Sequence, residues 1–345
     1  MPPHYFGRSS LDVKGIERTF WTAPPPVDAR SPAAATSAPT SVICDNEPLP
    51  LLIALHGLNS SGSRLAWWSG LDLRGPAAGF HSVFPDALKT VWDDHGCGRR
   101  DGADDAEFIA RLVTHLAGTG AADPERVFLT GVSSGATFAE RLARTQAIVV
   151  SGIALVVGTA RVASIKSAAK VQPGFDVLLI AGTGDPILPY QGGPPRGPLA
   201  APTMKSVSHV LVDPSGHDAV APEALAREWA AANACVAPPV VERIGMTDEG
   251  FQVDSLRWTA ASTEAPTVTL YRISGGGHGW PDGRQYLPKR FLGTIPQGWD
   301  GTALLLEFAR ASIARTARAR STGGPVRLTA SPPSCPPSSA RRETC

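Results

Sequence analysis

A strand, a tight turn and a helix follow one another between residues 126 and 144, and this order constrains the fold more than any other stretch. The apolar run at 127–130 is typical of a buried strand, and an alanine-rich helical pattern opens at Ala136. Between them lies GVSSG, a G-x-S-x-G turn at 131–135. Because glycines let strand and helix approach closely, we expect the Ser133 hydroxyl to stand accessible on a strained turn.

The motif alone does not separate a nucleophile from an ordinary Gly/Ser turn. A chain with this glycine and serine content contains the pattern by chance at roughly 0.3 matches per chain. The strand before the turn and the helix after it favour the nucleophile, and the pattern occurs once in the sequence. Ser133 is therefore the candidate nucleophile, and a structural turn is the alternative.

Apolar runs alternate with helical patterns along the rest of the chain. Strands are expected at 11–21, 51–55, 81–88, 127–130, 147–158, 175–182 and 268–273, and helices at 63–73, 105–116, 136–144, 222–234 and 302–314. Continuous apolar runs such as LLIAL are typical of strands that are buried on both faces of a parallel sheet. The alternation predicts an α/β fold, with a mostly parallel, doubly wound sheet and helices on both faces.

One large domain accommodates most of the 345 residues. We expect a catalytic domain at 1–320, with a Pro/Ala/Ser-rich surface loop at 22–40 and an irregular rim segment at 191–220. Residues 321–345 have too little apolar content to offset the entropy of ordering, and the sequence predicts a disordered tail there.

The net charge and the cysteine content of the chain indicate which binding partners and which cellular compartment to expect. The formal net charge is +1, which gives no reason to expect nucleic acid or a membrane as partner, and a small-molecule or oligomeric substrate fits better. The oligomeric state stays open, with a monomer assumed. No signal peptide is visible, so we expect a cytoplasmic protein, or a secreted one if the sequence lacks its natural beginning. The five cysteines have no metal-ligand spacing, so no metal is expected.

A serine nucleophile needs a base, a carboxylate that orients the base, and N–H donors for the oxyanion. Asp185 follows the expected strand at 175–182, and His278 follows the one at 268–273. The order Ser133, Asp185, His278 is the one that the α/β-hydrolase fold uses, and this chemistry requires no cofactor.

Other residues compete for these roles. Asp213 also follows an apolar run and is the alternative acid. His56 ends the strand at 51–55, where we expect it to pin its loop by hydrogen bonds, and His209 and His217 are expected on the rim surface.

Five landmarks between Leu51 and Pro281 resemble the polyhydroxybutyrate depolymerase and feruloyl esterase family of α/β-hydrolases. They are LIALHGLNSSG, DDAEFIARLV before ADPERVFLTGVSSGATFAERLA, GTGDPILPYQGG, WAAANAC and SGGGHGWP. The resemblance implies Ser133 as nucleophile, Asp185 as acid and His278 as base, with the backbone N–H groups of Leu58 and Ser134 as oxyanion hole.

The resemblance also implies an activity. It implies a serine carboxylic ester hydrolase that acts through an acyl-enzyme on short acyl, hydroxyacyl (polyhydroxybutyrate-type oligomer) or polyester-derived esters. A feruloyl-type aryl esterase is the alternative, and a catalytically silent binding protein of the same fold is a further one, against which the complete triad speaks.

Three positions depart from the family pattern. Ala181 stands where the family usually has histidine, and Ser134 where it usually has asparagine or alanine. The family often has a cysteine near residue 259 or 260 that would pair with Cys235, and this chain lacks it. The pairing of Cys44, Cys97 and Cys235 therefore stays open.

Three aromatic residues lie close in sequence to the expected site loops. Trp92, Trp280 and Tyr190 are candidates for substrate contact, and packing is the alternative for each. Because the tail lacks an aromatic platform, we expect soluble short esters and oligomers to be better substrates than crystalline polyester.

Overall fold

The computed structural model describes residues 7–23, 48–94, 102–167, 174–196, 218–262 and 264–321. The strands are β1 (Gly7–Val13), β2 (Ile16–Thr22), β3 (Leu49–Leu55), β4 (His81–Pro85), β5 (Ala122–Val132), β6 (Gly152–Val156), β7 (Asp176–Gly182), β8 (Val240–Met246), β9 (Gln252–Trp258) and β10 (Val268–Ile273). The helices are α1 (Gly62–Ser69), α2 (Leu71–Ala77), α3 (Asp105–Gly118), α4 (Ser134–Arg144), α5 (Val162–Ser167), α6 (Pro222–Ala232), α7 (Lys289–Leu292) and α8 (Gly301–Ser321), with a 3₁₀ turn, η1, at Leu88–Thr90.

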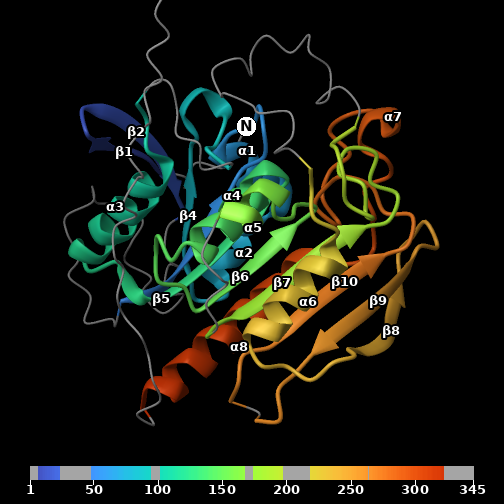
Figure 1. Cartoon of the computed structure of the whole chain (residues 1–345). Helices are drawn as coiled ribbons and strands as arrows, with labels where there is room; N and C mark the ends of the chain where they lie inside the picture. Colours follow the sequence, from blue (N-terminus) through green and yellow to red (C-terminus); the bar gives the residue numbers. More distant parts are fainter. Residues whose placement is uncertain are drawn as a thin grey trace, which may run out of the picture.

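The strands form one ten-stranded sheet in the order β1-β2-β4-β3-β5-β6-β7-β10-β9-β8 (Figure 1). Every pairing from β4 to β10 is parallel, and the pairings outside them are antiparallel. Helices cover both faces of the sheet. This architecture confirms the predicted mostly parallel, doubly wound sheet.

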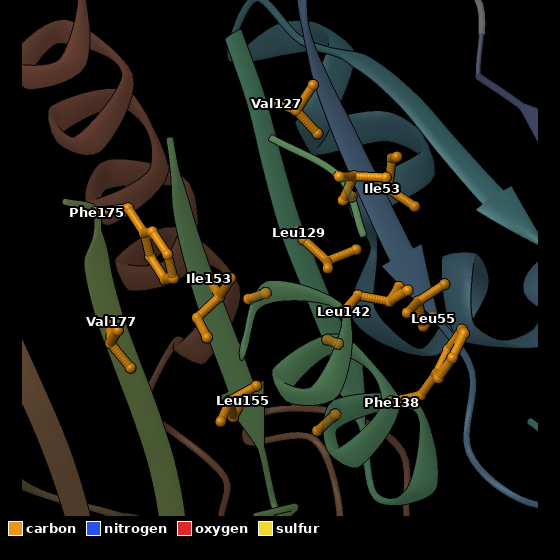
Figure 2. Close-up of a cluster of buried hydrophobic side chains, with 14 of the residues drawn as sticks. Ile53, Leu55, Val127, Leu129, Phe138, Leu142, Ile153, Leu155, Phe175 and Val177 are labelled. Carbon is orange, nitrogen blue, oxygen red and sulfur yellow. The ribbon is translucent and has the colours of Figure 1, made fainter. Parts of the chain in front are cut away.

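The sheet separates two apolar cores, because successive side chains of a strand point to opposite faces. On one face, alternating residues such as Leu129, Ile153 and Val177 pack against α3, α4 and α6 (Figure 2). On the other face, residues such as Phe128 and Leu178 pack against α1, α2 and α8. Burying one such side chain contributes about 1.5–3 kcal/mol, so these two layers hold the central strands in place.

Two expected elements are each divided in the structure. The stretch at 11–21 is not a single strand, because Lys14 and Gly15 have positive φ angles of 55° and 80° and turn the chain into the β1–β2 hairpin. The expected helix at 63–73 ends at Gly70, whose φ of 66° interrupts it and divides α1 from α2. In both cases a glycine supplies a backbone conformation that L-residues rarely adopt.

Strands β8 and β9 lie in a stretch with no predicted element. They add two antiparallel strands to the edge of the sheet beyond β10. The side chains of β8 are exposed on both faces, and Val240 and Met246 are 68% and 61% exposed. Without a buried face, β8 lacks the contrast between apolar and polar positions by which a strand is found in a sequence.

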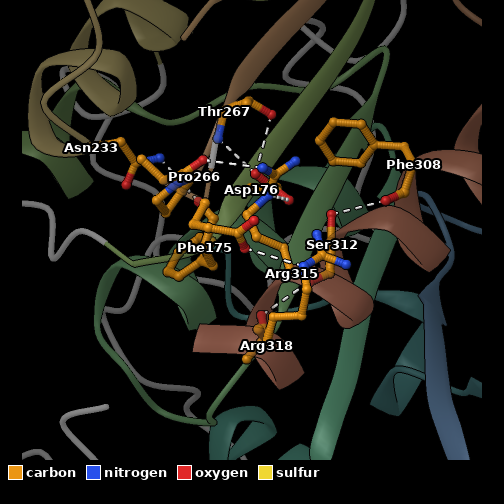
Figure 3. A network of polar contacts seen from close by, with 12 residues as sticks. Phe175, Asp176, Asn233, Pro266, Thr267, Phe308, Ser312, Arg315 and Arg318 are labelled. Atoms are coloured by element: carbon orange, nitrogen blue, oxygen red, sulfur yellow. Dashed lines mark hydrogen bonds and ion pairs between the residues drawn. The ribbon is translucent and has the colours of Figure 1, made fainter. Parts of the chain in front are cut away.

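A polar network joins the beginnings of β7 and β10 to α8 (Figure 3). The buried carboxylate of Asp176 accepts hydrogen bonds from the Thr267 backbone N–H, at 2.6 Å, and from Arg315 Nε, at 3.1 Å. Arg315 also donates to the Ala265 carbonyl. The network therefore holds β7 and β10 together at the end of the sheet opposite Asp185 and His278.

Several predicted segments lie wholly or mostly outside the described residues. These are the loop at 22–40 beyond residue 23, the rim segment at 197–217, and residues 322–345 after the end of α8. Cys44 and Cys97 lie outside as well, whereas Cys235 is a free thiol that donates to the Pro266 carbonyl. Among the described helices, none combines the length and the apolar character that crossing a bilayer requires.

Candidate active site

Ser133 occupies the turn between β5 and α4 with φ and ψ of 56° and −123°. This conformation is unfavourable for a residue with a side chain, and the backbone around it holds it in place. The Ser133 N–H donates to the Val156 carbonyl at 3.0 Å. A Cβ atom at Gly135 would overlap the Leu55 carbonyl oxygen, and one at Gly131 would overlap the backbone of Gly135. Both glycines are therefore required by the close contact of the helix with the strands.

The structure brings Ser133, His278 and Asp185 together in a hydrogen-bonded chain. His278 Nε2 lies 2.8 Å from Ser133 Oγ, and His278 Nδ1 lies 2.6 Å from Asp185 Oδ2. An ionised carboxylate only accepts hydrogen bonds, so Nδ1 carries the proton and Nε2 accepts from the serine hydroxyl in the neutral imidazole. The arrangement is that of a serine nucleophile with its base and orienting acid.

Neighbouring parallel strands carry the acid and the histidine. Gly182 at the end of β7 pairs with Ile273 at the end of β10. Asp185 Oδ1 accepts from the Ile187 and Leu188 N–H groups at 2.8 and 2.9 Å, which fixes the carboxylate and leaves Oδ2 to His278. His278 is 3% exposed. The geometry thus depends on the β7–β10 pairing and on a tight turn after β7.

The loop after β3 lies against the turn of Ser133. A Cβ atom on Gly57 would lie 3.4 Å from Ser133 Cβ. The backbone N–H groups of Leu58 and Ser134 donate to no described residue, so both are available to an oxyanion. The Ser134 hydroxyl is also buried without a hydrogen-bond partner in the described part of the chain.

His56 holds this loop, as predicted. Its Nδ1 donates to the Gly57 carbonyl at 2.7 Å, and its Nε2 accepts from the Ala87 N–H at 2.9 Å. The His56 carbonyl accepts from Trp92 Nε1 at 2.8 Å. Burial lowers the pKa of His56 below its usual value and keeps it neutral. His56 therefore positions the loop that carries Leu58 and does not contact Ser133.

Trp92 and Trp280, the two tryptophans predicted to contact substrate, are both buried. Trp92 is 1% exposed and stacks on Phe138 in the core against α4. Trp280 is 4% exposed, and its indole N–H donates to Thr302 Oγ1 in the core on the opposite face. Both indoles are buried against a helix of the core, which favours packing, the alternative role for each. Substrate contact by either residue stays a prediction.

Tyr190 lies beside the acid. Its hydroxyl donates to Glu223 at 2.9 Å, and burial, followed by this carboxylate, raises its pKa. It lines a narrow cavity of about 20 Å³, together with Asp185 and other residues of the neighbouring loops. The other lining residues are Val157, Gly158, Thr159, Ala181, Gly182, Leu188, Pro189 and Pro222. Substrate contact by Tyr190 stays a prediction.

Sequence reasoning missed an exposed aromatic cluster next to the site. Trp68 of α1 stacks on Tyr286, and Arg284 lies over the ring of Trp67. A signal was present, because two adjacent tryptophans follow the oxyanion loop and a tyrosine follows His278 within ten residues. The rivals Asp213, His209 and His217 lie outside the described residues. Among the described residues, no group of three or more metal-ligating side chains is placed to hold a metal ion.

Comparison with known proteins finds a family model that matches part of the chain. The model of the esterase PHB depolymerase family matches residues 37–188, which include Ser133 and Asp185. The matched residues make up less than half of the chain. Together with the triad, this match shows that the chain is a carboxylic ester hydrolase of the serine type. No curated protein sequence matches the chain significantly.

Solved structures resemble this esterase in fold. An acetyl xylan esterase from Aspergillus awamori is 13% identical, with a TM-score of 0.50 over 88% of this chain and 99% of the other. A thermostable esterase is 11% identical, with a TM-score of 0.47 over 91% of this chain and 63% of the other. The fluorophosphonate-binding serine hydrolase F of Staphylococcus aureus is 12% identical, with a TM-score of 0.40 over 52% of this chain and 80% of the other. The first of these supports the α/β-hydrolase fold.

Proposed function

We propose that this esterase cleaves short acyl and hydroxyacyl esters through an acyl-enzyme on Ser133. The observation that carries the proposal is the hydrogen-bonded chain from Ser133 Oγ through His278 to Asp185, with distances of 2.8 and 2.6 Å. These three side chains have the donor and acceptor order that proton transfer from the serine requires.

In the first half of the reaction, Ser133 Oγ attacks the ester carbonyl while His278 Nε2 takes the hydroxyl proton. Asp185 keeps the Nδ1 proton in place and stabilises the imidazolium that forms. The N–H groups of Leu58 and Ser134 have no other acceptor among the described residues, and they bind the oxyanion. His278 then gives its proton to the leaving alcohol, which departs.

In the second half, His278 takes a proton from water, and the resulting hydroxide attacks the acyl-enzyme. Collapse of this second tetrahedral intermediate breaks the bond to Ser133 Oγ and returns the proton to it. The products are a carboxylic acid and an alcohol. These steps are carried by the protein's own groups, and the substrate preference within the ester class depends on the surface around them.

The hydroxyacyl preference rests on the family match, because PHB depolymerases take their name from polyhydroxybutyrate. A feruloyl-type aryl esterase remains the alternative within the same chemistry. Hydrolysis of p-nitrophenyl acyl esters, methyl ferulate and a soluble 3-hydroxybutyrate oligomer, measured side by side, separates the two. Preference for methyl ferulate over the oligomer would contradict the proposal.

The Ser133→Ala variant tests the nucleophile. We expect kcat to fall by about 10⁴–10⁶-fold, because the variant keeps the turn but loses the attacking oxygen. Labelling by a fluorophosphonate probe should disappear, while the circular dichroism spectrum stays unchanged. The exposed Ser10 on β1 offers a control, and Ser10→Ala should keep both activity and labelling. Turnover by Ser133→Ala near the original rate would rule out this serine.

A further inference from the structure

Four side chains from two segments meet at the protein surface, three of them exposed and Trp68 half-buried, and we call them the aromatic–cationic surface: Trp67, Trp68, Arg284 and Tyr286. The rings of Trp68 and Tyr286 are parallel within 3°, with centroids 4.3 Å apart. The guanidinium carbon of Arg284 lies 4.1 Å from the centre of the Trp67 ring. Trp67 and Tyr286 remain 42% and 39% exposed. Two segments far apart in sequence thus meet in ordered contacts that still face solvent.

This surface adjoins the triad. The segment after His278 folds back on the histidine loop. The His278 N–H donates to the Leu292 carbonyl, and the Gly277 N–H donates to the Thr294 carbonyl at 2.8 Å. The same segment folds over the loop of the acid, because a Cβ atom on Gly293 would lie 3.1 Å from the Gly184 carbonyl oxygen. Desolvation and the Asp185 carboxylate raise the pKa of Tyr286 to about 12. The helix that carries the two tryptophans begins at Gly62, four residues after Leu58.

The segment that carries Arg284 and Tyr286 has three cations without an ion pair among the described residues. Arg284, Lys289 and Arg290 are exposed, and none forms an ion pair within the described residues. The acidic groups nearby have other contacts: Asp282 accepts from the Gly298 N–H, and Glu249 accepts from the Gln297 N–H. Lys289 lies close enough to Glu249 to help lower the pKa of that carboxyl group. Because Lys289 already interacts with Glu249, Arg284 is the cation best placed to bind a ligand.

Stacking prepares Arg284 for a carboxylate. A guanidinium that lies flat on an indole has its N–H donors in the plane of the group, where the ring does not cover them. Such a planar fork matches the two oxygens of a carboxylate. Because the arginine is already ordered on Trp67, less side-chain entropy is lost when a ligand binds.

The chemistry decides which part of the ester meets this surface. His278 protonates the leaving alcohol, so the alcohol part lies on the histidine side of Ser133, and the carbonyl oxygen lies toward Leu58 and Ser134. We propose that the aromatic–cationic surface binds the alcohol part of the ester and that Arg284 recognises a carboxylate on it. The proposal rests on the proposed ester hydrolysis and narrows it to esters of hydroxy acids with a free carboxylate end.

The experiment compares two substrates that differ only in that end. They are a soluble 3-hydroxybutyrate oligomer with a free carboxylate and the same oligomer with a terminal carboxamide. The wild type should show a higher kcat/KM for the carboxylate, and Arg284→Gln should lower the ratio of the two values at least about tenfold, the usual range for hydrogen bonds to charged groups. The kcat/KM for the carboxamide should fall less than the kcat/KM for the carboxylate, and added salt should reduce the wild-type preference.

Two further variants sharpen the comparison. Arg8 lies over the ring of Trp21 on the edge strand β1, with 5.9 Å between its guanidinium carbon and the ring centroid, and Arg8→Gln should leave the ratio unchanged. Trp67→Leu removes the ring under Arg284 and should lower the ratio of the two kcat/KM values. Equal turnover of the two oligomers by the wild type, or an equal loss for both in Arg284→Gln, would overturn the inference.

A failure of ester hydrolysis would look different. If the wild type cleaved no ester, the proposed function would fall, and binding would still test the surface. Calorimetry with Ser133→Ala should then show tighter binding of the carboxylate oligomer than of the carboxamide, and equal binding would refute the inference independently of turnover.

Discussion

His56 makes two hydrogen bonds that only a neutral imidazole can make together. Nδ1 donates to Gly57 and Nε2 accepts from Ala87, so a second ring proton would face the Ala87 N–H. The side chain is 0% exposed, and its pKa lies below the usual 6.5. An unfolded chain takes up a proton on this histidine below about pH 6.5. The folded chain takes it up only at lower pH, so this contribution to stability is full above that pH and is lost as the pH falls.

We therefore expect His56→Gln to make the free energy of unfolding less dependent on pH between about 7 and 5. The variant should also lose about 1–3 kcal/mol at pH 7, because the hydrogen bonds to the loop are weakened, and kcat should fall as the Leu58 N–H moves. Urea unfolding at both pH values and a p-nitrophenyl acetate assay measure these effects.

His81 provides the control for this variant. Burial lowers its pKa as well, and it lies at the start of β4, away from the loop of Leu58. His81→Gln should reduce the pH dependence but leave kcat unchanged. A drop in kcat as large as that of His56→Gln would show that the loss does not come from the oxyanion loop.

At the scale of residues, the triad could be predicted and the substrate contacts could not. Ser133, Asp185 and His278 each follow an apolar run, and the carboxyl ends of parallel strands meet at one edge of the sheet. The position of an aromatic residue in the chain does not indicate which way its ring points. Trp92 and Trp280 are buried on opposite faces, while the Trp68–Tyr286 pair depends on a contact between distant segments.

At the scale of elements, α4 packs so closely on β3 that Gly135 has no room for a side chain. A Cβ atom there would lie 2.5 Å from the His56 carbonyl oxygen and still closer to that of Leu55. We expect Gly135→Ala to lower the free energy of unfolding by about 3 kcal/mol, because the overlapping atoms belong to the backbone and cannot move away by a change of rotamer. Thermal unfolding, with activity as a second measurement, checks this.

Gly118 in the last turn of α3 is the matched control. A Cβ atom there would meet nothing within 4 Å. Gly118→Ala should therefore be neutral or stabilise the protein by up to about 1 kcal/mol, through reduced entropy of the unfolded chain. If both variants behaved alike, the close packing of α4 on β3 would not be the cause.

The central elements could be predicted because both faces of their strands are apolar, whereas those at the edges could not. The β10 strand has the predicted bounds, and α3 begins after Asp104, which caps it as expected by accepting from the Glu107 N–H. The β1–β2 hairpin depends on the φ angles of Lys14 and Gly15. Strand β8 has no buried face at all.

At the scale of the whole molecule, a buried ion pair ties the edge hairpin to the central layers. Arg18 of β2 donates to Asp105 of α3 at 2.6 Å, and both side chains are nearly inaccessible to solvent. Asp105 also accepts from the Asp93 N–H at 2.7 Å, which anchors the loop after η1. One carboxylate of α3 thus connects the distant strand β2 and the nearby loop after η1.

Replacing one partner should cost more than replacing both. Arg18→Leu removes the guanidinium that pairs with the buried Asp105 carboxylate, and we expect the free energy of unfolding in urea to fall by about 3–5 kcal/mol. The double variant Arg18→Leu/Asp105→Leu should recover a large part of this loss. A double variant as unstable as the sum of the two single ones would show that the two side chains stabilise the protein independently, so that the loss in Arg18→Leu does not come from the carboxylate that remains.

The pairing of β7 with β10 also limits how the chain can change in length. Gly182 and Ile273 pair at the ends of the two strands, and Asp185 and His278 follow them by three and five residues. The hydrogen bonds of Asp176 hold the opposite ends of the two strands together. One residue inserted into either strand would advance it by about 3.3 Å and turn the following side chains to the other face. The 2.6 Å hydrogen bond between His278 Nδ1 and Asp185 Oδ2 would be broken by a shift of this size. Insertions and deletions in this enzyme must therefore fall outside these two strands if the acid is to keep its histidine.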